Sequence, residues 1–220
     1  DYAHDDAVRV LLGMIAKTAA MHDRIIKPIL SLFDGHHVRV SVLIKTSKEA
    51  ASNFQEQLGY RLRTKDVPYK FIKYPSGDQI KSASGPLWIG PLMDKEIAGR
   101  LTEECAIQTC LPTSDELEEL IAKGLAWSDK DVEYATREMI RSVKHISSAA
   151  DLLSRQHMLL SLNSMPRLAG TKGAPKMDDV ISDLIELGYS AARYPDMEPM
   201  FVTDASFDDV ISIFRKYHYD

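Results

Sequence analysis

The sequence has few of the features that mark several protein classes. Its two cysteines, Cys105 and Cys110, are too few for a disulfide framework or a four-cysteine zinc site, and they suit a reducing, cytoplasmic compartment. No apolar run reaches the roughly 18 residues that could span a bilayer. The eleven glycines form neither a G-x-G-x-x-G pattern nor a phosphate loop. With 45% apolar and 27% charged residues over 220 positions, the composition predicts a globular protein that can bury its own core.

The net charge of −5 is unevenly spread along the chain. Residues 1–92 carry 13 Lys and Arg against 9 Asp and Glu, which is a net charge of +4. Residues 93–220 carry 14 against 23, which is a net charge of −9. Only the first part therefore attracts a polyanion such as nucleic acid.

The first part begins with the pattern of one helix and a hairpin. Apolar residues at helical spacing predict a helix over residues 4–20. Two β-rich runs, 25–33 and 36–45, flank Asp34-Gly35, which is a strong hairpin signal. Pro28 has no amide hydrogen, so the first strand starts after it or bulges there. Ser47 then caps a helix that Gly59 is expected to end, and two short strands follow at 60–64 and 69–74.

The composition becomes acidic and helical after Leu92, and we place a domain boundary near Met93. The helical pattern predicts helices over residues 94–110, 114–123 and 129–144, then one from 175 or 176 to Gly188 and a last one capped by Ser206. Strands are expected at 189–193 and 200–203. The order helix, strand, turn, strand, helix predicts a small α+β, winged-helix-like module at this end.

A catalytic site does not stand out. Cys105 and Cys110 lie about 140° apart around their predicted helix, so they do not face each other. His36 and His37 have no third metal ligand nearby. Glutamates in the first turn of the helix at 114–123 are typical of a solvated helix end.

The stretch from Tyr60 to Lys81 is different because cations alternate with aromatic residues. It holds Arg61, Arg63, Lys65, Lys70, Lys73 and Lys81 among Tyr60, Tyr69, Phe71 and Tyr74. Such a pattern can neutralise phosphates and stack on bases. It is equally typical of a solvated hairpin whose aromatic side chains point into a core, and composition leaves both interpretations open.

One string carries a resemblance to a known family. Gly85-Pro86-Leu87-Trp88-Ile89-Gly90-Pro91-Leu92 resembles the G-P-L-W-x-G-P-L element of the tRNA (guanine-N2)-dimethyltransferases, which make N2,N2-dimethylguanosine at position 26 of tRNA with S-adenosylmethionine. Stretches at 7–13, 29–42, 188–193 and 202–205 resemble the same family in the same order. The resemblance covers most of the chain and is stronger in its first half.

The resemblance implies a fold and a division of labour. Family members begin with a class I methyltransferase domain that binds the cofactor and holds the catalytic acidic motif, and these 220 residues contain no counterpart of it. The chain opens Asp1-Tyr2-Ala3-His4 without an initiator Met, so we expect it to continue something longer. Residues 1–46 would be the last helix and hairpin of the methyltransferase sheet, 47–92 a basic connecting segment, and 93–220 a C-terminal α+β domain. The fold class is thus a mixed α/β (α+β) one.

The sequence departs from the family in three places. Many members carry paired zinc-ribbon cysteines before the G-P-L-W element, but residues 61–84 contain none, so we expect no metal. Tyr194-Pro195-Asp196 stands where the family tends to have Thr-His-Phe, and Val202 where it has Lys. Leu159-Leu160 replaces an expected aromatic pair. We therefore expect the C-terminal module to serve mainly in packing or positioning.

The sequence thus predicts the C-terminal part of a tRNA guanine-26 N2-dimethyltransferase. It would bind tRNA in the cytoplasm and pack on the catalytic domain, which holds the cofactor site. The candidate tRNA contacts are Arg39, Lys45, Arg61, Arg63, Lys70, Lys73, Lys81 and the aromatic Trp88, which is either structural or stacks on a base. Two alternatives stay open: a non-enzymatic nucleic-acid-binding or interaction module of winged-helix type, and a purely structural cap on the catalytic domain.

Overall fold

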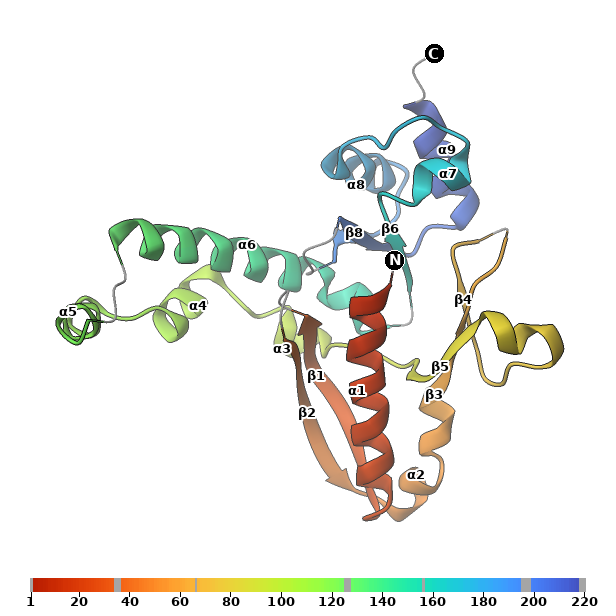
Figure 1. Ribbon diagram of the computed structural model, residues 1–220, viewed down its shortest axis with the longest axis horizontal. Helices are drawn as coiled ribbons and strands as arrows, with labels where there is room; N and C mark the ends of the chain where they lie inside the picture. The colour runs from red at the N-terminus through yellow and green to blue at the C-terminus, as the bar shows by residue number, and fades with distance from the viewer. Residues whose placement is uncertain are drawn as a thin grey trace.

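A computed structural model describes residues 2–33, 37–65, 67–124, 128–155, 157–194 and 199–217. Within these ranges the chain forms three small antiparallel sheets connected and covered by helices (Figure 1). The mixed α/β class predicted from the sequence is confirmed. None of the described helices is long and apolar enough to cross a membrane.

The first sheet is the predicted hairpin. Helix α1 (Ala3–Ala20) is followed by β1 (Arg24–Phe33) and β2 (Val38–Thr46), which pair antiparallel. The register shifts between Pro28 and Leu30, so the bulge expected at the proline is present. The predicted turn at Asp34-Gly35, and His36 after it, lie outside the described residues. Val8 and Leu12 of α1 are fully buried against this sheet, since alternate β2 residues turn their apolar side chains to the helix.

The second sheet has the order β4-β3-β5. Its elements are α2 (Lys48–Ser52), η1 (Phe54–Gln57), β3 (Leu58–Leu62), β4 (Lys70–Ile72), η2 (Gly77–Ser82) and β5 (Ala83–Trp88). Ser47 caps α2 as predicted, by accepting a hydrogen bond from the Ala50 amide. The prediction that Gly59 ends this helix is wrong, because Gly59 lies inside β3.

The G-P-L-W string forms strand β5, which the sequence did not predict. Gly59 and Gly85 make this pairing possible, because both positions lack space for a side chain. A Cβ on Gly59 would lie 2.6 Å from the Ile72 carbonyl oxygen, and one on Gly85 would lie 2.9 Å from the Gly59 carbonyl oxygen. Glycine therefore allows β3 to sit closely between its two neighbours.

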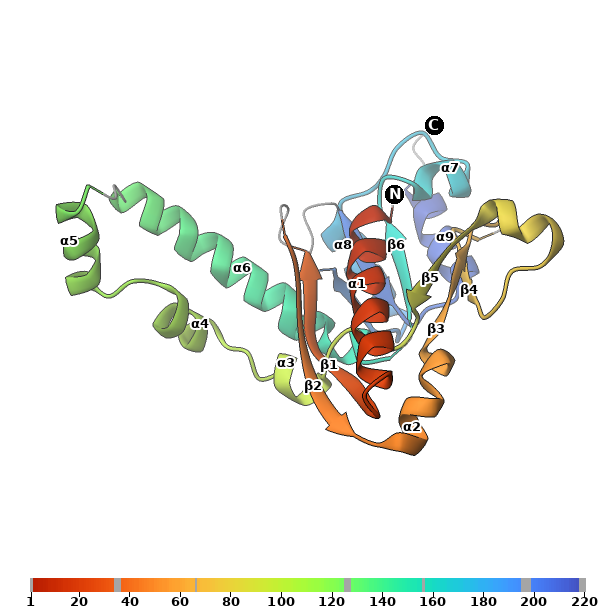
Figure 2. The same cartoon turned by 60° about the horizontal axis from the view of Figure 1, so that its bottom comes forward.

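The next four helices start and end in the body of the molecule, and the middle ones form an extension that projects from it (Figures 1 and 2). They are α3 (Lys95–Ala98), α4 (Glu103–Cys110), α5 (Ser114–Ala122) and α6 (Asp129–Leu153). The single helix predicted over 94–110 is wrong: α3 ends at Gly99, and Thr102 caps a new helix. The helix predicted over 129–144 continues to Leu153, because Ile146, Ala149 and Leu153 pack into the core.

The third sheet belongs to the C-terminal unit and has the order β6-β8-β7. Its elements are β6 (Met158–Ser161), α7 (Met165–Ala169), α8 (Met177–Glu186), β7 (Ala191–Arg193), β8 (Met200–Thr203) and α9 (Phe207–Lys216). The sequence predicted α8, β7, β8 and α9 but missed β6 and α7. Fully buried Phe201 and Phe214 lie in a separate core made by this unit.

A larger hydrophobic core connects the first hairpin, the second sheet and the C-terminal unit. It includes Leu12 of α1, Trp88 of β5, Ala149 of α6 and Val202 of β8. Three further expectations stay predictions: the domain boundaries at 46 and 92, the assignment of the hairpin to a methyltransferase sheet, and the likeness of the C-terminal unit to a winged helix.

Candidate nucleic-acid interface

Four cations lie exposed on the second sheet and its connections. We call residues 58–88 the basic lobe and Arg63, Lys65, Lys70 and Lys81 its outer cations. Among the described residues, none of these four side chains forms an ion pair with an acidic residue.

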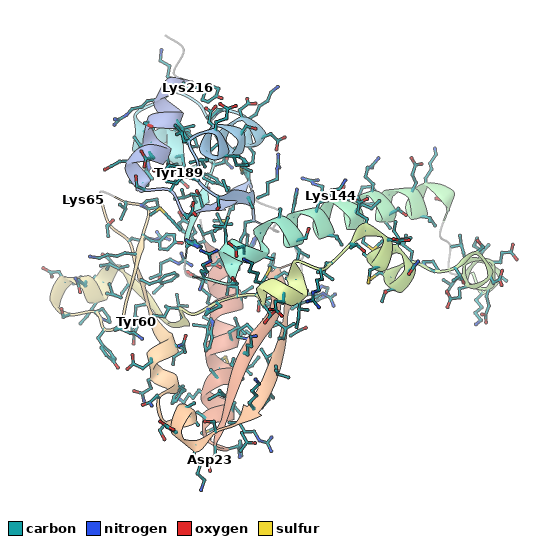
Figure 3. All side chains as sticks on the ribbon, turned by 180° about the vertical axis from the view of Figure 1, so that it is seen from behind. Asp23, Tyr60, Lys65, Lys144, Tyr189 and Lys216 are labelled. Carbon is teal, nitrogen blue, oxygen red and sulfur yellow. The ribbon has the colours of Figure 1, made fainter. Side chains whose placement is uncertain are left out.

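Strand pairing places the outer cations at one end of the lobe. Lys70 pairs with Leu62 at the end of the β3–β4 ladder. The Arg63 amide donates a hydrogen bond at 3.2 Å to the carbonyl oxygen of Ser82, the residue after Lys81. Figure 3 shows Lys65 near the tip of the β3–β4 connection, well away from Tyr60 in the middle of β3. The backbone positions of the four cations therefore lie along one rim of the lobe.

Arg61 does not share that rim, although the sequence grouped it with these cations. Its side chain is 2% exposed and forms ion pairs with Asp5 and, at 2.7 Å, with Asp6 of α1. Its guanidinium also lies over the ring of Tyr69, 4.2 Å from the centroid. Arg61 has no exposed surface with which to reach a phosphate, so we leave it out of the proposed interface.

Asp5 is the centre of this buried network. It accepts a hydrogen bond from Arg9 at 2.7 Å and one from the Tyr194 hydroxyl at 3.2 Å, besides the contact with Arg61. Arg9 in turn donates to the Trp88 carbonyl oxygen at 3.1 Å. The network therefore joins α1 to both the basic lobe and the C-terminal unit.

Tyr69 makes a second connection between the basic lobe and the C-terminal unit. Its hydroxyl accepts a hydrogen bond at 2.9 Å from the Leu159 amide in β6. Burial raises the pKa of Tyr69, so this hydroxyl stays protonated at neutral pH.

The charges in the network stabilise one another. Burial opposes ionisation of Asp5, but the neighbouring Arg9 and Arg61 outweigh it and hold the pKa of Asp5 below its ordinary value. Burial likewise disfavours the charged form of Arg61, yet Asp5, Tyr69 and Asp6 raise its pKa. Both groups are therefore charged at neutral pH, and removing either takes a buried partner from the other: Asp5 would keep Arg9, and Arg61 would keep Asp6.

Two other residues of the basic lobe that were predicted to contact tRNA, Lys73 and Trp88, already interact with other parts of the chain. Lys73 forms an exposed ion pair with Glu56 at 3.3 Å. Trp88 is 4% exposed and its indole N–H donates to the Pro91 carbonyl oxygen at 2.8 Å. Of the two roles expected for Trp88, its burial favours the structural one.

Arg39 and Lys45 lie on the other side of α1 from the basic lobe. Both are exposed residues of β2, opposite Leu32 and Ile25 of β1 respectively. Helix α1 packs between the hairpin and the second sheet (Figure 1). The structure therefore does not bring these two cations together with the outer cations, and their contact with tRNA stays a prediction.

The acidic side of the network was not predicted from the sequence. Asp5 and Arg9 stand four residues apart, the spacing at which an acid and a base pair on a helix, and this signal was available. Nothing local marks Arg61 as their partner, because it lies 56 residues further along the chain.

A cleft of about 920 Å³ lies between the start of β1, the α2–η1 segment and residues 88–96. Its walls include Trp88 and the ion pair of Lys27 with Asp94. Asp94 also accepts hydrogen bonds from the Glu96 and Ile97 amides, both at 3.0 Å. Among the described residues no group of three or more His, Cys, Asp or Glu side chains could hold a metal ion, and Cys105 and Cys110 are free and exposed.

The fold and the basic lobe define a mixed α/β protein with a surface suited to a polyanion. The model of the N2,N2-dimethylguanosine tRNA methyltransferase family matches residues 1–159. The chain therefore belongs to this family, and the resemblance seen in the sequence is confirmed.

Curated relatives support the same assignment. The chain is 34% identical over 129 residues to the tRNA (guanine(26)-N(2))-dimethyltransferase of Pyrobaculum calidifontis, covering 58% of this chain and 34% of the relative. It is 25% identical over 214 residues to the enzyme of the same name from Thermococcus kodakarensis, covering 96% of this chain and 48% of the relative. The chain thus spans between a third and a half of the length of these relatives.

A solved structure shares the fold. It is described as the complex of Trm1 from Pyrococcus horikoshii with S-adenosyl-L-methionine, and it matches 96% of this chain and 49% of its own with a TM-score of 0.67 at 23% identity.

Within the cleft, Asp94 is already used by Lys27 and two backbone amides, so it is not a free acceptor for the ribose hydroxyls or the ammonium group of S-adenosylmethionine. Glu49, Glu56 and Glu96 also line this cleft.

Proposed function

We propose that this chain is the tRNA-positioning part of a tRNA (guanine-26-N2)-dimethyltransferase. The outer cations of the basic lobe contact backbone phosphates, and Tyr74, which is 75% exposed, is available to stack on a base. The observation that carries the proposal is the clustering of four exposed cations that no described acidic residue neutralises. Lys73 joins them only if its exposed pair with Glu56 opens, which costs little.

The chemistry itself belongs to the part of the relatives that this chain does not cover. S-adenosylmethionine supplies the methyl groups that the exocyclic amine of guanine receives, and an acidic residue outside these 220 residues orients or deprotonates that amine. Two observations support this division: the chain matches at most half of the relatives above, and its glycines form no cofactor loop.

The open edge of β2 is where the two parts would join. In the described residues β2 pairs only with β1, although a two-stranded sheet is marginal in water. Leu43 and Ile44 of β2 are about half exposed. Addition of further strands at this edge would complete the backbone hydrogen bonding and cover these side chains, as expected for the end of a methyltransferase sheet.

Salt-dependent binding of tRNA tests the assignment of the outer cations. We expect the affinity of the chain for tRNA to fall as salt rises, and replacing all four cations with Gln to reduce the slope of log K against log [salt] by up to about 3. The matched control replaces one Arg and three Lys outside the lobe: Lys17, Arg167, Lys172 and Lys176. Equal slopes for the two quadruple variants would refute the assignment.

Equilibrium dialysis with labelled S-adenosylmethionine tests the division of labour. We expect no saturable binding by this chain, with or without tRNA. Saturable binding would place a cofactor site in the chain and overturn the division. Absence of tRNA binding at low salt, together with a stable fold, would instead favour a structural cap on the catalytic domain.

A further inference from the structure

The helical extension ends far from the three sheets. We call residues 103–136 the distal arm; it holds α4, α5 and the first third of α6 (Figures 1 and 2). An ion pair between Glu103 and Lys144 at 2.9 Å fastens α4 to α6. The tip formed by α5 lies at the end furthest from α1 in both views.

The described residues of the distal arm include apolar side chains but form no core of their own. Neither α4 nor α5 contains a buried residue, and the first buried side chain among those described in α6 is Val143. Ile121 of α5 is 51% exposed and Tyr134 of α6 is 59% exposed. Leu117, Leu120 and Ile121 follow the i, i+3, i+4 spacing that places them on one face of α5.

Helix α5 gains little stability from the described residues around it. A helix of 9 residues is too short to be stable alone in water, and the capping box between Thr113 and Glu116 offsets only about 1 kcal/mol of that deficit. An apolar partner surface over Leu117 and Ile121 would provide the missing stabilisation.

The charge of the distal arm determines which partner can cover it. Residues 103–136 carry nine Asp and Glu against two Lys and Arg, a net charge of −7. Three of these carboxylates, on Glu104, Glu118 and Glu133, are exposed and have no described ion-pair partner. Phosphate is therefore repelled, whereas a cationic surface is attracted.

We propose that the distal arm is a docking surface for a protein segment of one kind, a basic amphipathic helix. Its apolar face would cover Leu117, Leu120 and Ile121, and its Lys and Arg would face Glu104, Glu118 and Glu133. This is the helix-on-helix mode of peptide recognition, with charge complementarity supplying the specificity.

The test measures binding of a labelled 18-residue Leu/Lys amphipathic peptide by fluorescence anisotropy. We expect saturable binding, weakened by about tenfold or more in the double variant Leu117→Gln, Ile121→Gln. Gln is nearly as good a helix former as Leu, so the change removes apolar surface and largely preserves the helix. Replacing Glu104, Glu118 and Glu133 with Gln should weaken binding most at low salt.

Two matched controls separate docking from general stickiness. The double variant Ile185→Gln, Leu187→Gln removes two similarly exposed apolar residues near the end of α8 and should bind the peptide like the unaltered chain. A Leu/Glu peptide of the same pattern should not bind. Equal loss in both double variants, or binding of the acidic peptide, would overturn the proposal.

Circular dichroism and sedimentation velocity complete the test. Unchanged helicity in the Leu117→Gln, Ile121→Gln variant shows that weaker binding reflects lost contacts. Self-association that this variant abolishes, with no peptide binding, would make the occupant a second copy of the chain and refute our assignment. Protection of the arm by tRNA would refute it as well.

Discussion

Replacement of Arg61 by Met removes one charge from the buried network and keeps most of the side-chain volume. Breaking a buried ion pair in this way costs about 3–5 kcal/mol. Here Asp5 would keep Arg9 and Tyr194, and the side chain of Asp6 is 26% exposed and can be hydrated. We therefore expect a loss at the lower end, about 3 kcal/mol, which corresponds to a fall in Tm of about 6–12 °C for a chain of this size.

Urea unfolding followed by circular dichroism measures this loss. The matched control is Arg63→Met two residues further on, because Arg63 is exposed and has no described ion-pair partner. That variant should stay within about 0.5 kcal/mol of the unaltered chain. If the two variants differed by less than about 1 kcal/mol, the network would not be what holds α1 to the basic lobe.

Three further predictions follow from single positions. The pKa of Asp5 is lower in the folded than in the unfolded chain, where it is about 4, so its charge contributes stability above that pH that is lost as the pH falls through the folded-state pKa. The Asp5→Asn variant should therefore lose less stability on acidification than the exposed control Asp115→Asn. Gly85→Ala should cost about 1–3 kcal/mol by chemical denaturation, because its Cβ would meet a backbone oxygen at 2.9 Å; Gly173→Ala, where no atom lies within 4 Å, should be nearly neutral. Trp88→Phe should cost about 1–3 kcal/mol in the same assay, since it leaves a carbonyl oxygen without its donor, and an unchanged midpoint would contradict that role.

Local patterns predicted much of the secondary structure. The capping boxes at Thr113 and Ser128 begin helices where the sequence placed them, and the bulge lies next to Pro28. These features depend on residues within four positions of one another, so the sequence contains their whole cause.

Features that depend on distant partners could not be predicted in this way. Gly59 has the signature of a helix end, but pairing on both sides makes it part of a strand. Arg61 has the same composition around it as Arg63, and only the approach of α1 decides that one is buried and the other is not. The order of residues showed that cations cluster in this stretch, but the fold determines which of these cations are exposed to water.

The buried network also has a mechanical consequence. Asp5 is held by Arg9 on its own helix, by Arg61 of β3 and by Tyr194 after β7, so a load applied to the basic lobe is passed directly to α1 and to the C-terminal unit. Separating these groups would strand opposite charges in a dry interior at a cost of several kcal/mol. On the proposal that the outer cations bind tRNA, we expect α1, the basic lobe and the C-terminal unit to move together when tRNA binds, because their shared contact at Asp5 resists separation.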